Sequence, residues 1–256
     1  MECTVLESGE FKYLDEGSGE PMVILHGLFG ALSNFTQVRE HFSKRFRVLT
    51  PMLPIYELSL RKTSAKEIAK HIKGFVDHLN LEKVHLLGNS LGGHVALIFT
   101  KNHLERVASM TLTASSGLYE NAFGNSFPRR EDKDYIRNKV KVTFHDPKHA
   151  TDELVEECFE AVNDRNKILR ILSIAKSAIR HNMEEDLPNM KTPSCIIWGR
   201  NDIVTPPDVG ELFHEKLPDS DLFWIDKCGH APMMEHPEEF NRLLDSWYNS
   251  RGIAMV

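Results

Sequence analysis

A serine between two glycines, in the segment Gly88–Gly92 with the sequence GNSLG, has the spacing of a turn that exposes a nucleophile. The apolar run Val84–Leu87 predicts a strand before this turn, and residues 93–99 predict a helix after it. Glycines two residues before and two after Ser90 remove Cβ atoms where the strand and helix backbones approach each other. The helix N-terminus would favour negative charge beside the serine. We therefore predict that Ser90 is a nucleophile and that the turn is not merely structural.

Two later residues have the types and the order needed to activate this serine. A serine hydroxyl is a poor nucleophile until a base takes its proton, and the base needs an acid that fixes its tautomer. Asp202 follows the apolar segment 196–198 through a short loop, and His230 follows the segment 222–225 through a loop that contains Gly229. Because both would lie at the carboxyl ends of strands, we predict that His230 is the base and Asp202 its orienting acid.

The alternatives to this pair are structural. Asp202 would cap a turn, and a lone histidine is more often structural than catalytic. Other late histidines are less well placed, because His214 lies within a predicted helix and His236 at the start of another. His85 and His94 flank the serine turn and are expected to pack or to face solvent. These alternatives leave the assignment of the base unchanged.

Two backbone N–H groups are needed to stabilise the oxyanion that forms when a serine attacks a carbonyl. One is expected from Leu91, the residue after the predicted nucleophile. The other is expected from the glycine-rich turn 26–30 (HGLFG), where Leu28 is the first choice and Phe29 the second. His26 is expected to fix this turn structurally instead of acting as a base.

The composition is that of a globular protein with enough apolar residues for a core. The chain has 256 residues, of which 41% are hydrophobic and 27% charged. Its net charge of −6 at pH 7 leaves no basic surplus to neutralise nucleic-acid phosphates. The basic segments 129–130 and 139–141 are short and are expected to be solvated helix faces. We therefore expect a small-molecule partner and no nucleic acid.

The cysteines and the N-terminal residues favour a cytoplasmic location. The four cysteines show no C-x-x-C spacing, so neither a zinc site nor a redox pair is expected, and their small number suits a reducing compartment. The first residues do not have the pattern of a signal peptide, and no apolar run has the length of a membrane span. We expect no metal, no cofactor and no membrane contact. The cysteines are Cys3, Cys158, Cys195 and Cys228.

Strand and helix signals alternate along most of the chain, which predicts an α/β protein with a mostly parallel sheet and helices on both faces. An early hairpin is expected at Thr4–Leu6 and Phe11–Leu14, and Ser33 is the expected N-cap of the first helix. The expected later strands are 22–25, 46–49, 84–87, 107–113, 194–198 and 222–225, and the helices between and after them are 33–42, 64–79, 207–216 and 237–248.

Residues 117–190 interrupt this alternation. They contain no clear strand and have helical patterns near 132–142, 151–162 and 166–179, with Asp152 as the expected cap of the second helix. We predict that this segment is a helical cap inserted over the carboxyl edge of the sheet. The core would then be formed by residues 1–116 and 191–256.

These features together resemble the α/β-hydrolase fold. The turn 26–30, the nucleophile turn at Ser90, the acid Asp202 and the histidine His230 match that family in kind, order and spacing. The resemblance implies an eight-stranded sheet, a Ser–acid–His triad and a helical cap after the sixth strand. One departure lies at 52–57 (MLPIYE), where the family usually reads Asp-Leu-Pro-Gly-x-Gly. Bulky residues replace both glycines, so this loop must take a different path, and one such path leads toward the site.

Within the family, the serine turn and the tail 227–243 resemble the meta-cleavage-product hydrolases, which split carbon–carbon bonds in vinylogous 1,5-diketones. Those enzymes carry a tryptophan after the catalytic histidine, where this chain has Ala231. They also carry a cap arginine for the substrate carboxylate, and this chain has Cys158 in its place. Arg165 and Arg170 are the candidates to replace that arginine.

We predict a serine hydrolase that cleaves small carboxylic esters through an acyl-enzyme, because the turn 26–30 is similar to that of small acyl esterases. Phe29, Asn34, Asn89 and Ala231 are expected to line its substrate pocket. Carbon–carbon bond hydrolysis with the same triad is the alternative. A ligand-binding receptor on a hydrolase scaffold is the alternative from another class. The protein is expected to be a monomer or a homodimer.

Overall fold

The structure is a computed structural model that describes residues 4–30, 32–121 and 129–253. Its centre is an eight-stranded sheet with the strand order β1-β2-β4-β3-β5-β6-β7-β8. The strands from β3 to β8 are parallel, and β1 and β2 form an antiparallel edge, which confirms the predicted fold class. The strands are β1 (Leu6–Ser8), β2 (Phe11–Gly17), β3 (Pro21–Leu25), β4 (Arg47–Pro51), β5 (Val84–Asn89), β6 (Val107–Thr113), β7 (Ser194–Gly199) and β8 (Ser220–Ile225).

Three of these strands set the positions from which the predicted catalytic residues leave the sheet. β5 runs two residues beyond its predicted end, because Gly88 and Asn89 still pair with Leu112 and Thr113 of β6. β7 and β8 pair in parallel over their whole lengths, from Ser194 beside Ser220 to Gly199 beside Ile225. The turns that follow β5, β7 and β8 therefore leave the sheet at its carboxyl edge.

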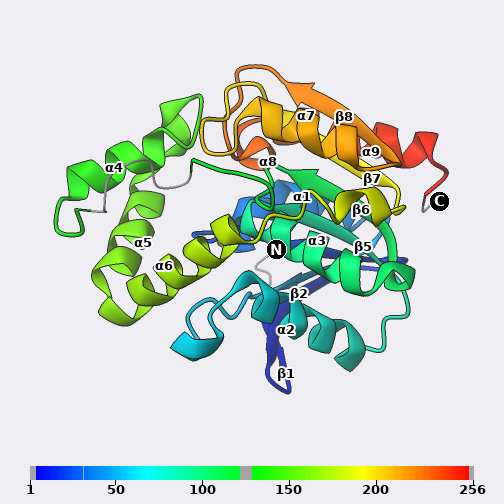
Figure 1. Ribbon diagram of the computed structural model, residues 1–256, viewed down its shortest axis with the longest axis horizontal. Coiled ribbons are helices and arrows are strands. Elements are labelled where there is room, and N and C mark those ends of the chain that lie inside the picture. The colour runs from blue at the N-terminus through cyan, green and yellow to red at the C-terminus, as the bar shows by residue number, and fades with distance from the viewer. Residues whose placement is uncertain (1–3, 31, 122–128, 254–256) are drawn as a thin grey trace.

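Helices cover both faces of the sheet (Figure 1). α2 (Ala65–His78), α3 (Leu91–Asn102) and α7 (Pro207–Lys216) contribute buried side chains to one core cluster. α1 (Thr36–Phe42) and α9 (Pro237–Ser250) contribute to a second cluster. A sheet covered on both faces buries both sets of strand side chains, which explains the continuous apolar runs of the central strands.

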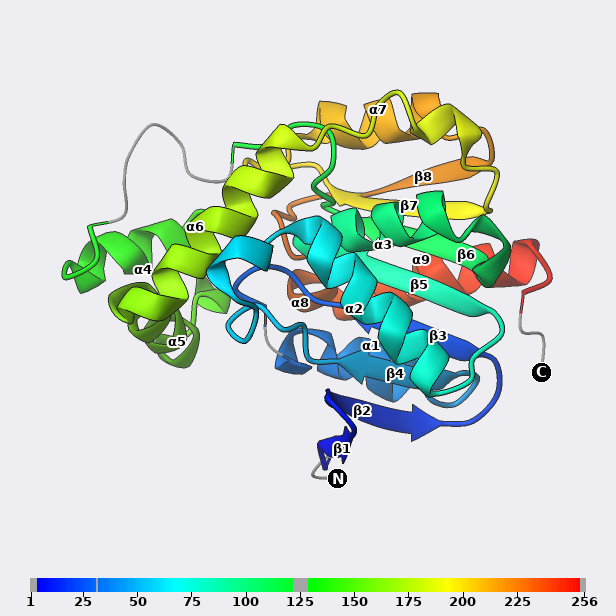
Figure 2. The same cartoon turned by 60° about the horizontal axis from the view of Figure 1, so that its bottom comes forward.

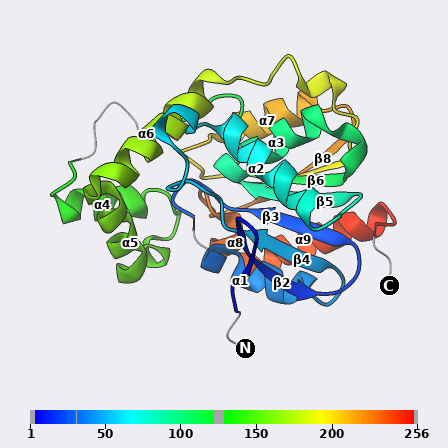
Figure 3. The ribbon, with the colours of Figure 1, turned by 90° about the horizontal axis from the view of Figure 1, so that it is seen from below.

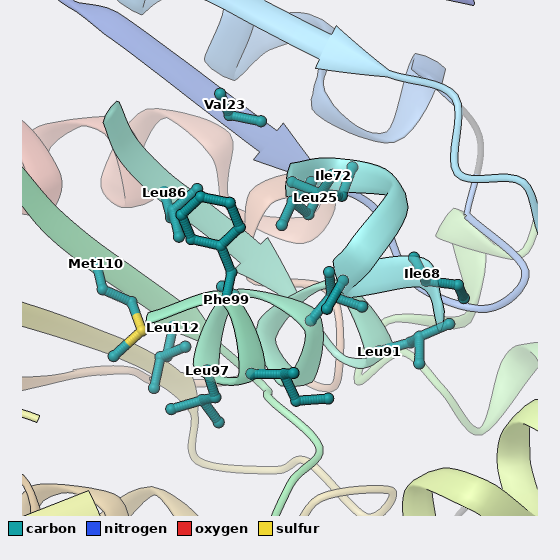
Figure 4. Packing of buried hydrophobic residues seen from close by; sticks show 14 of the residues in the cluster. Val23, Leu25, Ile68, Ile72, Leu86, Leu91, Leu97, Phe99, Met110 and Leu112 are labelled. Carbon is teal, nitrogen blue, oxygen red and sulfur yellow. The ribbon is translucent and has the colours of Figure 1, made fainter. Parts of the chain in front are cut away.

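Successive residues of β3 divide between the two clusters, because strand side chains alternate between faces. Val23 and Leu25 lie in the first cluster, whereas Met22 and Ile24 lie in the second. Figure 4 shows Val23 and Leu25 with Phe99 of α3 and other members of the first cluster. The helix that follows Ser90 is therefore packed firmly against the sheet.

The segment between β6 and β7 contains three longer helices that lie together beside the sheet, on the side opposite the C-terminus (Figures 1, 2 and 3). They are α4 (Lys133–Lys141), α5 (Asp152–Asn163) and α6 (Arg165–Arg180). Most of their buried side chains, among them Ile136 and Val155, belong to the cluster that also contains Phe240 and Leu244 of α9, whereas Ile174 of α6 belongs to the first cluster. These helices therefore pack mainly with the core on one face of the sheet, and we refer to them as the cap helices.

One predicted helix start and one predicted cap were wrong. α1 begins at Thr36 and not at Ser33, because Leu32–Phe35 forms a separate 3-10 turn, η1. α5 is capped by Thr151 and not by Asp152. The Thr151 backbone is extended, as an N-cap requires, and its hydroxyl accepts a backbone N–H of the first turn at 3.2 Å.

The remaining described elements are short. They are the 3-10 turns η2 (Leu60–Lys62), η3 (Leu104–Arg106), η4 (Pro147–His149) and η5 (Leu187–Asn189), and the helix α8 (Pro232–Glu235). Cys158, Cys195 and Cys228 are free thiols, and Cys3 lies outside the described residues. Within the described ranges, no helix combines the length and apolar character needed to cross a bilayer.

Candidate active site

Ser90 occupies the turn between β5 and α3 in a backbone conformation that few residues adopt. Its φ is 54° and its ψ is −120°, in a region that is costly for any residue with a Cβ. The turn is held by hydrogen bonds from Ser90 N to Thr113 O (3.2 Å) and from Ser116 N to Ser90 O (3.1 Å). Ser90 stands at the N-cap position of α3, but its hydroxyl does not cap the helix. The hydroxyl is therefore left for other partners.

The glycines around Ser90 are required by close backbone contacts. A Cβ on Gly88 would lie 2.5 Å from the backbone of Gly92, and a Cβ on Gly92 would lie 2.0 Å from the carbonyl oxygen of Leu25. Both distances are far below van der Waals contact. Strand β5, helix α3 and the end of β3 thus meet as the sequence predicts for a nucleophile turn.

His230 and Asp202 form a buried hydrogen-bonded pair. His230 Nδ1 lies 2.9 Å from Asp202 Oδ2, and the Asp202 carboxylate is almost fully buried. The Asp202 carboxylate also accepts the backbone N–H groups of Val204 (2.8 Å) and Thr205 (3.0 Å) and the hydroxyl of Thr205 (2.7 Å). These bonds satisfy the carboxylate and fix its direction toward the imidazole.

The environment of His230 favours its charged form. Burial opposes that form, but the negative charge of Asp202 and its hydrogen bond outweigh burial and raise the pKa of His230. The charges of Glu120 and Glu235 act in the same direction. An imidazole in this position can accept a proton as a general base and return it in the next step.

Glu235 positions the loop that carries His230, and sequence reasoning missed it. Its buried carboxylate accepts the backbone N–H groups of Gly229 (2.6 Å), His145 (2.8 Å) and Asp146 (3.2 Å). Only the proximity of this glutamate to His230 in the sequence could have suggested the role. The contacts with the segment between α4 and η4 depend on tertiary structure.

The turn 26–30 lies beside Ser90, and His26 fixes it. A Cβ on Gly27 would lie 3.4 Å from the Ser90 Cβ. His26 Nε2 accepts the backbone N–H of Leu53 (3.2 Å), so Nδ1 carries the proton and donates to Gly27 O (2.8 Å). Burial lowers the pKa of His26, which favours this neutral form. Leu28, from the same turn, lines one cavity together with Leu91 and Ser90.

That cavity has a volume of about 500 Å³ and lies between the sheet edge and the cap helices. Ser90 and His230 line it, and Asp202 lies behind His230. The side chains expected to form the substrate pocket, Phe29, Asn34, Asn89 and Ala231, also line it. Its cap wall is apolar and includes Ile136, Val140, Leu154, Val162, Ile168 and Ile174.

Two charged side chains other than His230 line the cavity among the described residues, namely Glu120 and Lys139. Sequence reasoning found neither, because no motif marks the segment after β6 or the exposed face of α4. Cys158 also lines the cavity, and burial raises its pKa to about 11. Neither Arg165 nor Arg170 is among the described lining residues.

The two arginines that could have replaced a cap arginine are placed elsewhere. Arg170 donates from Nε to Leu58 O (2.8 Å) and from Nη1 to Asn166 O (3.0 Å). Arg165 is exposed at the start of α6. The described cation of the cavity is therefore Lys139, an exposed residue of the cap.

The loop 52–57 does not reach the cavity. Its side chains Leu53 and Ile55 are buried in the core cluster beneath α2 and α3. Lys167 of α6 lies over the Tyr56 ring, 5.3 Å from its centroid. No residue of this loop is among the described residues that line the cavity. The loop thus contacts α6 through Tyr56, whereas Ile55, at the first of the two glycine positions, packs in the core.

The other histidines have packing roles or lie on helices. His85 is buried and bonds Ser109 Oγ (2.8 Å), and His94 is buried with Nε2 2.9 Å from His181 Nδ1. His214 lies within α7. None of them is among the described lining residues of the cavity.

Comparison with protein families gives a match to the alpha/beta hydrolase fold over residues 20–155. A 2-hydroxy-6-oxononadienedioate/2-hydroxy-6-oxononatrienedioate hydrolase of Comamonas testosteroni is 30% identical over 251 residues, with 90% of this chain and 87% of that protein covered. A 2-hydroxy-6-oxo-6-phenylhexa-2,4-dienoate hydrolase of Burkholderia cepacia is 29% identical over 251 residues, again covering 90% and 87%.

Two solved structures are similar over nearly the whole chain. One is an alpha/beta hydrolase enzyme from the metagenome of lagoon sediments at Mar Chica, Morocco, with a TM-score of 0.82, 50% identity, and coverage of 98% of this chain and 100% of that one. The other is a meta-cleavage product hydrolase from Pseudomonas fluorescens, a mutant complexed with acetates. It has a TM-score of 0.82, 26% identity and 94% coverage of each chain.

Proposed function

Because the chain belongs to the alpha/beta hydrolase fold family, we propose that it is a serine hydrolase that cleaves small carboxylic esters through an acyl-enzyme at Ser90. One observation carries this proposal. The hydrogen-bonded pair of His230 and Asp202 opens onto the same apolar cavity as Ser90, whose strained turn leaves its hydroxyl uncommitted.

In the first half of the reaction, His230 takes the proton of the Ser90 hydroxyl while the oxygen attacks the ester carbonyl. The imidazolium that forms is stabilised by the Asp202 carboxylate. The negative charge that develops on the carbonyl oxygen is held by the backbone N–H groups of Leu91 and Leu28. His230 then gives its proton to the leaving alcohol, and the acyl group stays on Ser90.

In the second half, a water molecule replaces the alcohol. His230 takes a proton from this water, which attacks the acyl carbonyl and releases the carboxylic acid with restoration of the Ser90 hydroxyl. Thr205 supports both halves, because its hydroxyl donates to Asp202 and keeps the carboxylate aimed at His230. Each step uses groups of this chain together with one water molecule.

The cavity favours a substrate with an uncharged acyl group. Its cap wall is largely aliphatic, with Lys139 as its one described cation, and the small side chain of Ala231 lines the cavity next to His230 in the sequence. A volume of about 500 Å³ suits a small aliphatic or aromatic ester. These features support ester hydrolysis over cleavage of a dianionic substrate.

A panel of p-nitrophenyl esters of increasing acyl length tests the proposal, with the wild-type protein and the Ser90→Ala variant side by side. We expect turnover of short esters by the wild type and its loss in the variant. Turnover so slow that each protein molecule reacts about once would instead favour a ligand-binding receptor on the same scaffold. Equal activity of both proteins would contradict the proposed nucleophile.

Carbon–carbon bond hydrolysis is the second candidate, and the relatives favour it. The proteins at 30% and 29% identity are named as hydrolases of dienoates. A dienoate carboxylate would need a cation in the cavity, and Lys139 is the described side chain that could supply it. If this candidate is correct, Lys139→Met will weaken turnover of a phenyl-dienoate and leave p-nitrophenyl butyrate hydrolysis nearly unchanged.

A further inference from the structure

The mechanism above does not use the one carboxylate that lines the cavity in the described part of the chain, that of Glu120. Glu120 belongs to the segment that follows β6 and is half-buried. The cavity wall is mostly apolar, but the residues next to Glu120 include the polar Ser116 and Asn121, and the cation Lys139 lines the same cavity. A charge in such surroundings is screened only weakly by water, so it acts on any charged group that enters the cavity.

Contacts on both sides fix the position of Glu120 relative to the reacting groups. On one side, Ser116 Oγ donates a hydrogen bond to the Glu120 carboxylate, and Ser116 N donates to Ser90 O (3.1 Å). On the other side, Asn121 N donates to Val204 O (2.6 Å), in the loop that follows Asp202. The carboxylate is therefore held between the nucleophile turn and the acid loop.

The electrostatic interactions of Glu120 agree with this position. Burial raises the pKa of Glu120, the hydrogen bond from Ser116 and the charge of His230 oppose that effect, and the charge of Asp202 adds to it. Glu120 in turn helps to raise the pKa of His230. The carboxylate thus interacts with the same groups that act on the substrate.

A carboxylate in this place repels anionic substrates and products but not neutral ones. A neutral ester enters the cavity without charge repulsion, whereas an acyl group that carries its own carboxylate meets a like charge at the half-buried Glu120. The cation Lys139 also lines the cavity, but it is exposed, so water screens its charge more strongly. Hydrolysis of a neutral ester itself creates a carboxylate at the Ser90 end of the cavity. That product is repelled as soon as it ionises.

We propose that Glu120 is the charge-selecting residue of this cavity, which excludes anionic acyl groups and promotes release of the carboxylate product. The inference rests on the proposed ester hydrolysis at Ser90 and names its substrate class as uncharged acyl esters. It assigns to Glu120 a role in specificity and no part in bond breaking.

The test compares two esters that differ in one group. p-Nitrophenyl valerate ends in a methyl group, and mono-p-nitrophenyl glutarate has a carboxylate in its place. At about pH 8, well above the usual range of a carboxyl group, the wild type should prefer the valerate. In Glu120→Gln, which keeps the length and a hydrogen-bond acceptor for Ser116, the preference measured by kcat/KM should fall by about tenfold or more.

Product inhibition gives a second readout that a merely structural role would not move. The inhibition constant of valerate should decrease in Glu120→Gln by a similar factor, because the product no longer meets a like charge. The matched control is Glu105→Gln, which removes one negative charge from an exposed position before β6, at the opposite end of the strand from Glu120. This control should change neither the ester preference nor the inhibition constant.

Unchanged ester preference and unchanged product inhibition in folded Glu120→Gln would overturn the inference. The thermal unfolding midpoint verifies folding. If Glu120→Gln does not fold, Glu120→Ala is judged by the same two readouts and must shift both in the same direction. Failure of the proposed function is distinguishable, because the wild type would then hydrolyse neither ester in a manner that depends on Ser90.

Discussion

The carboxylate of Glu235 accepts the backbone N–H of His145 at 2.8 Å, although 90 residues separate the two in the sequence. The same carboxylate accepts the N–H of Gly229, the residue before His230. His230 itself donates its backbone N–H to Thr143 O at 2.8 Å. The loop that carries the proposed base is thus joined directly to the segment that follows α4, so the position of the cap and that of His230 depend on each other.

The Glu235 contacts predict a loss of stability when its charge is removed. Glu235→Gln places an amide group where the carboxylate accepts several N–H donors, so at least one buried donor loses its partner. We expect the free energy of unfolding to fall by about 1.5–3 kcal/mol. The exposed Glu185→Gln should stay within about 0.5 kcal/mol of the wild type. Chemical denaturation measures both, and equal stability of the two variants would mean that these bonds contribute little.

The proposed nucleophile predicts selective covalent labelling. A fluorophosphonate probe should modify Ser90 alone, because the strained turn presents its hydroxyl beside His230. Ser90→Ala should abolish labelling and lower kcat by orders of magnitude, about 10⁶-fold in a comparable serine hydrolase. Peptide mapping by mass spectrometry identifies the modified residue. Modification of another serine, with Ser90 untouched, would refute the mechanism.

The pKa of His230 predicts how activity depends on pH. The base must be neutral, and its pKa is raised from the usual 6.5 of a histidine, so kcat/KM should rise with pH through a midpoint above that value. Asp202→Asn removes the carboxylate that raises the pKa, while burial still lowers it. The midpoint should therefore move to lower pH, and kcat should fall by about 10⁴-fold. An unchanged midpoint of the pH–rate profile in Asp202→Asn would mean that Asp202 does not set the pKa of the base.

The charges of the cavity predict which chemistry is faster. A carbon–carbon hydrolase must hold an anionic dienoate, and neither Arg165 nor Arg170 is among the described residues that line the cavity. Loss of such a charged contact should cost about 1.5–3 kcal/mol, or about 10- to 100-fold in kcat/KM. We expect p-nitrophenyl butyrate to be hydrolysed faster than a phenyl-dienoate substrate. Faster turnover of the dienoate would make carbon–carbon hydrolysis the function, with Lys139 as the cation that binds the substrate carboxylate.

Much of the fold could be predicted from local sequence patterns. Apolar runs such as Met22–Leu25 favour burial in a central strand, and the helix at Pro207–Lys216 has its proline and its apolar spacing within ten residues. The start of α1 at Thr36 and the cap of α5 at Thr151 escaped prediction. A 3-10 turn or an adjacent cap differs from the expected start by small energies that a local pattern does not resolve.

The sequence alone predicted the tight turn at Ser90, because glycines at positions 88 and 92 are the residues that the close approach of the flanking backbones allows. It also placed Asp202 and His230 after strands in the order that the resemblance requires. Only the folded chain shows that Glu120 brings a negative charge to the cavity and that Glu235 holds the loop of His230. Glu120 and Glu235 belong to no local motif. The neighbour of Glu120, Asn121, is bonded to Val204 O in the acid loop, and Glu235 accepts the N–H of His145, 90 residues away. Hydrogen bonding and charge interactions depend on distances in space, which the chain sets only when it folds.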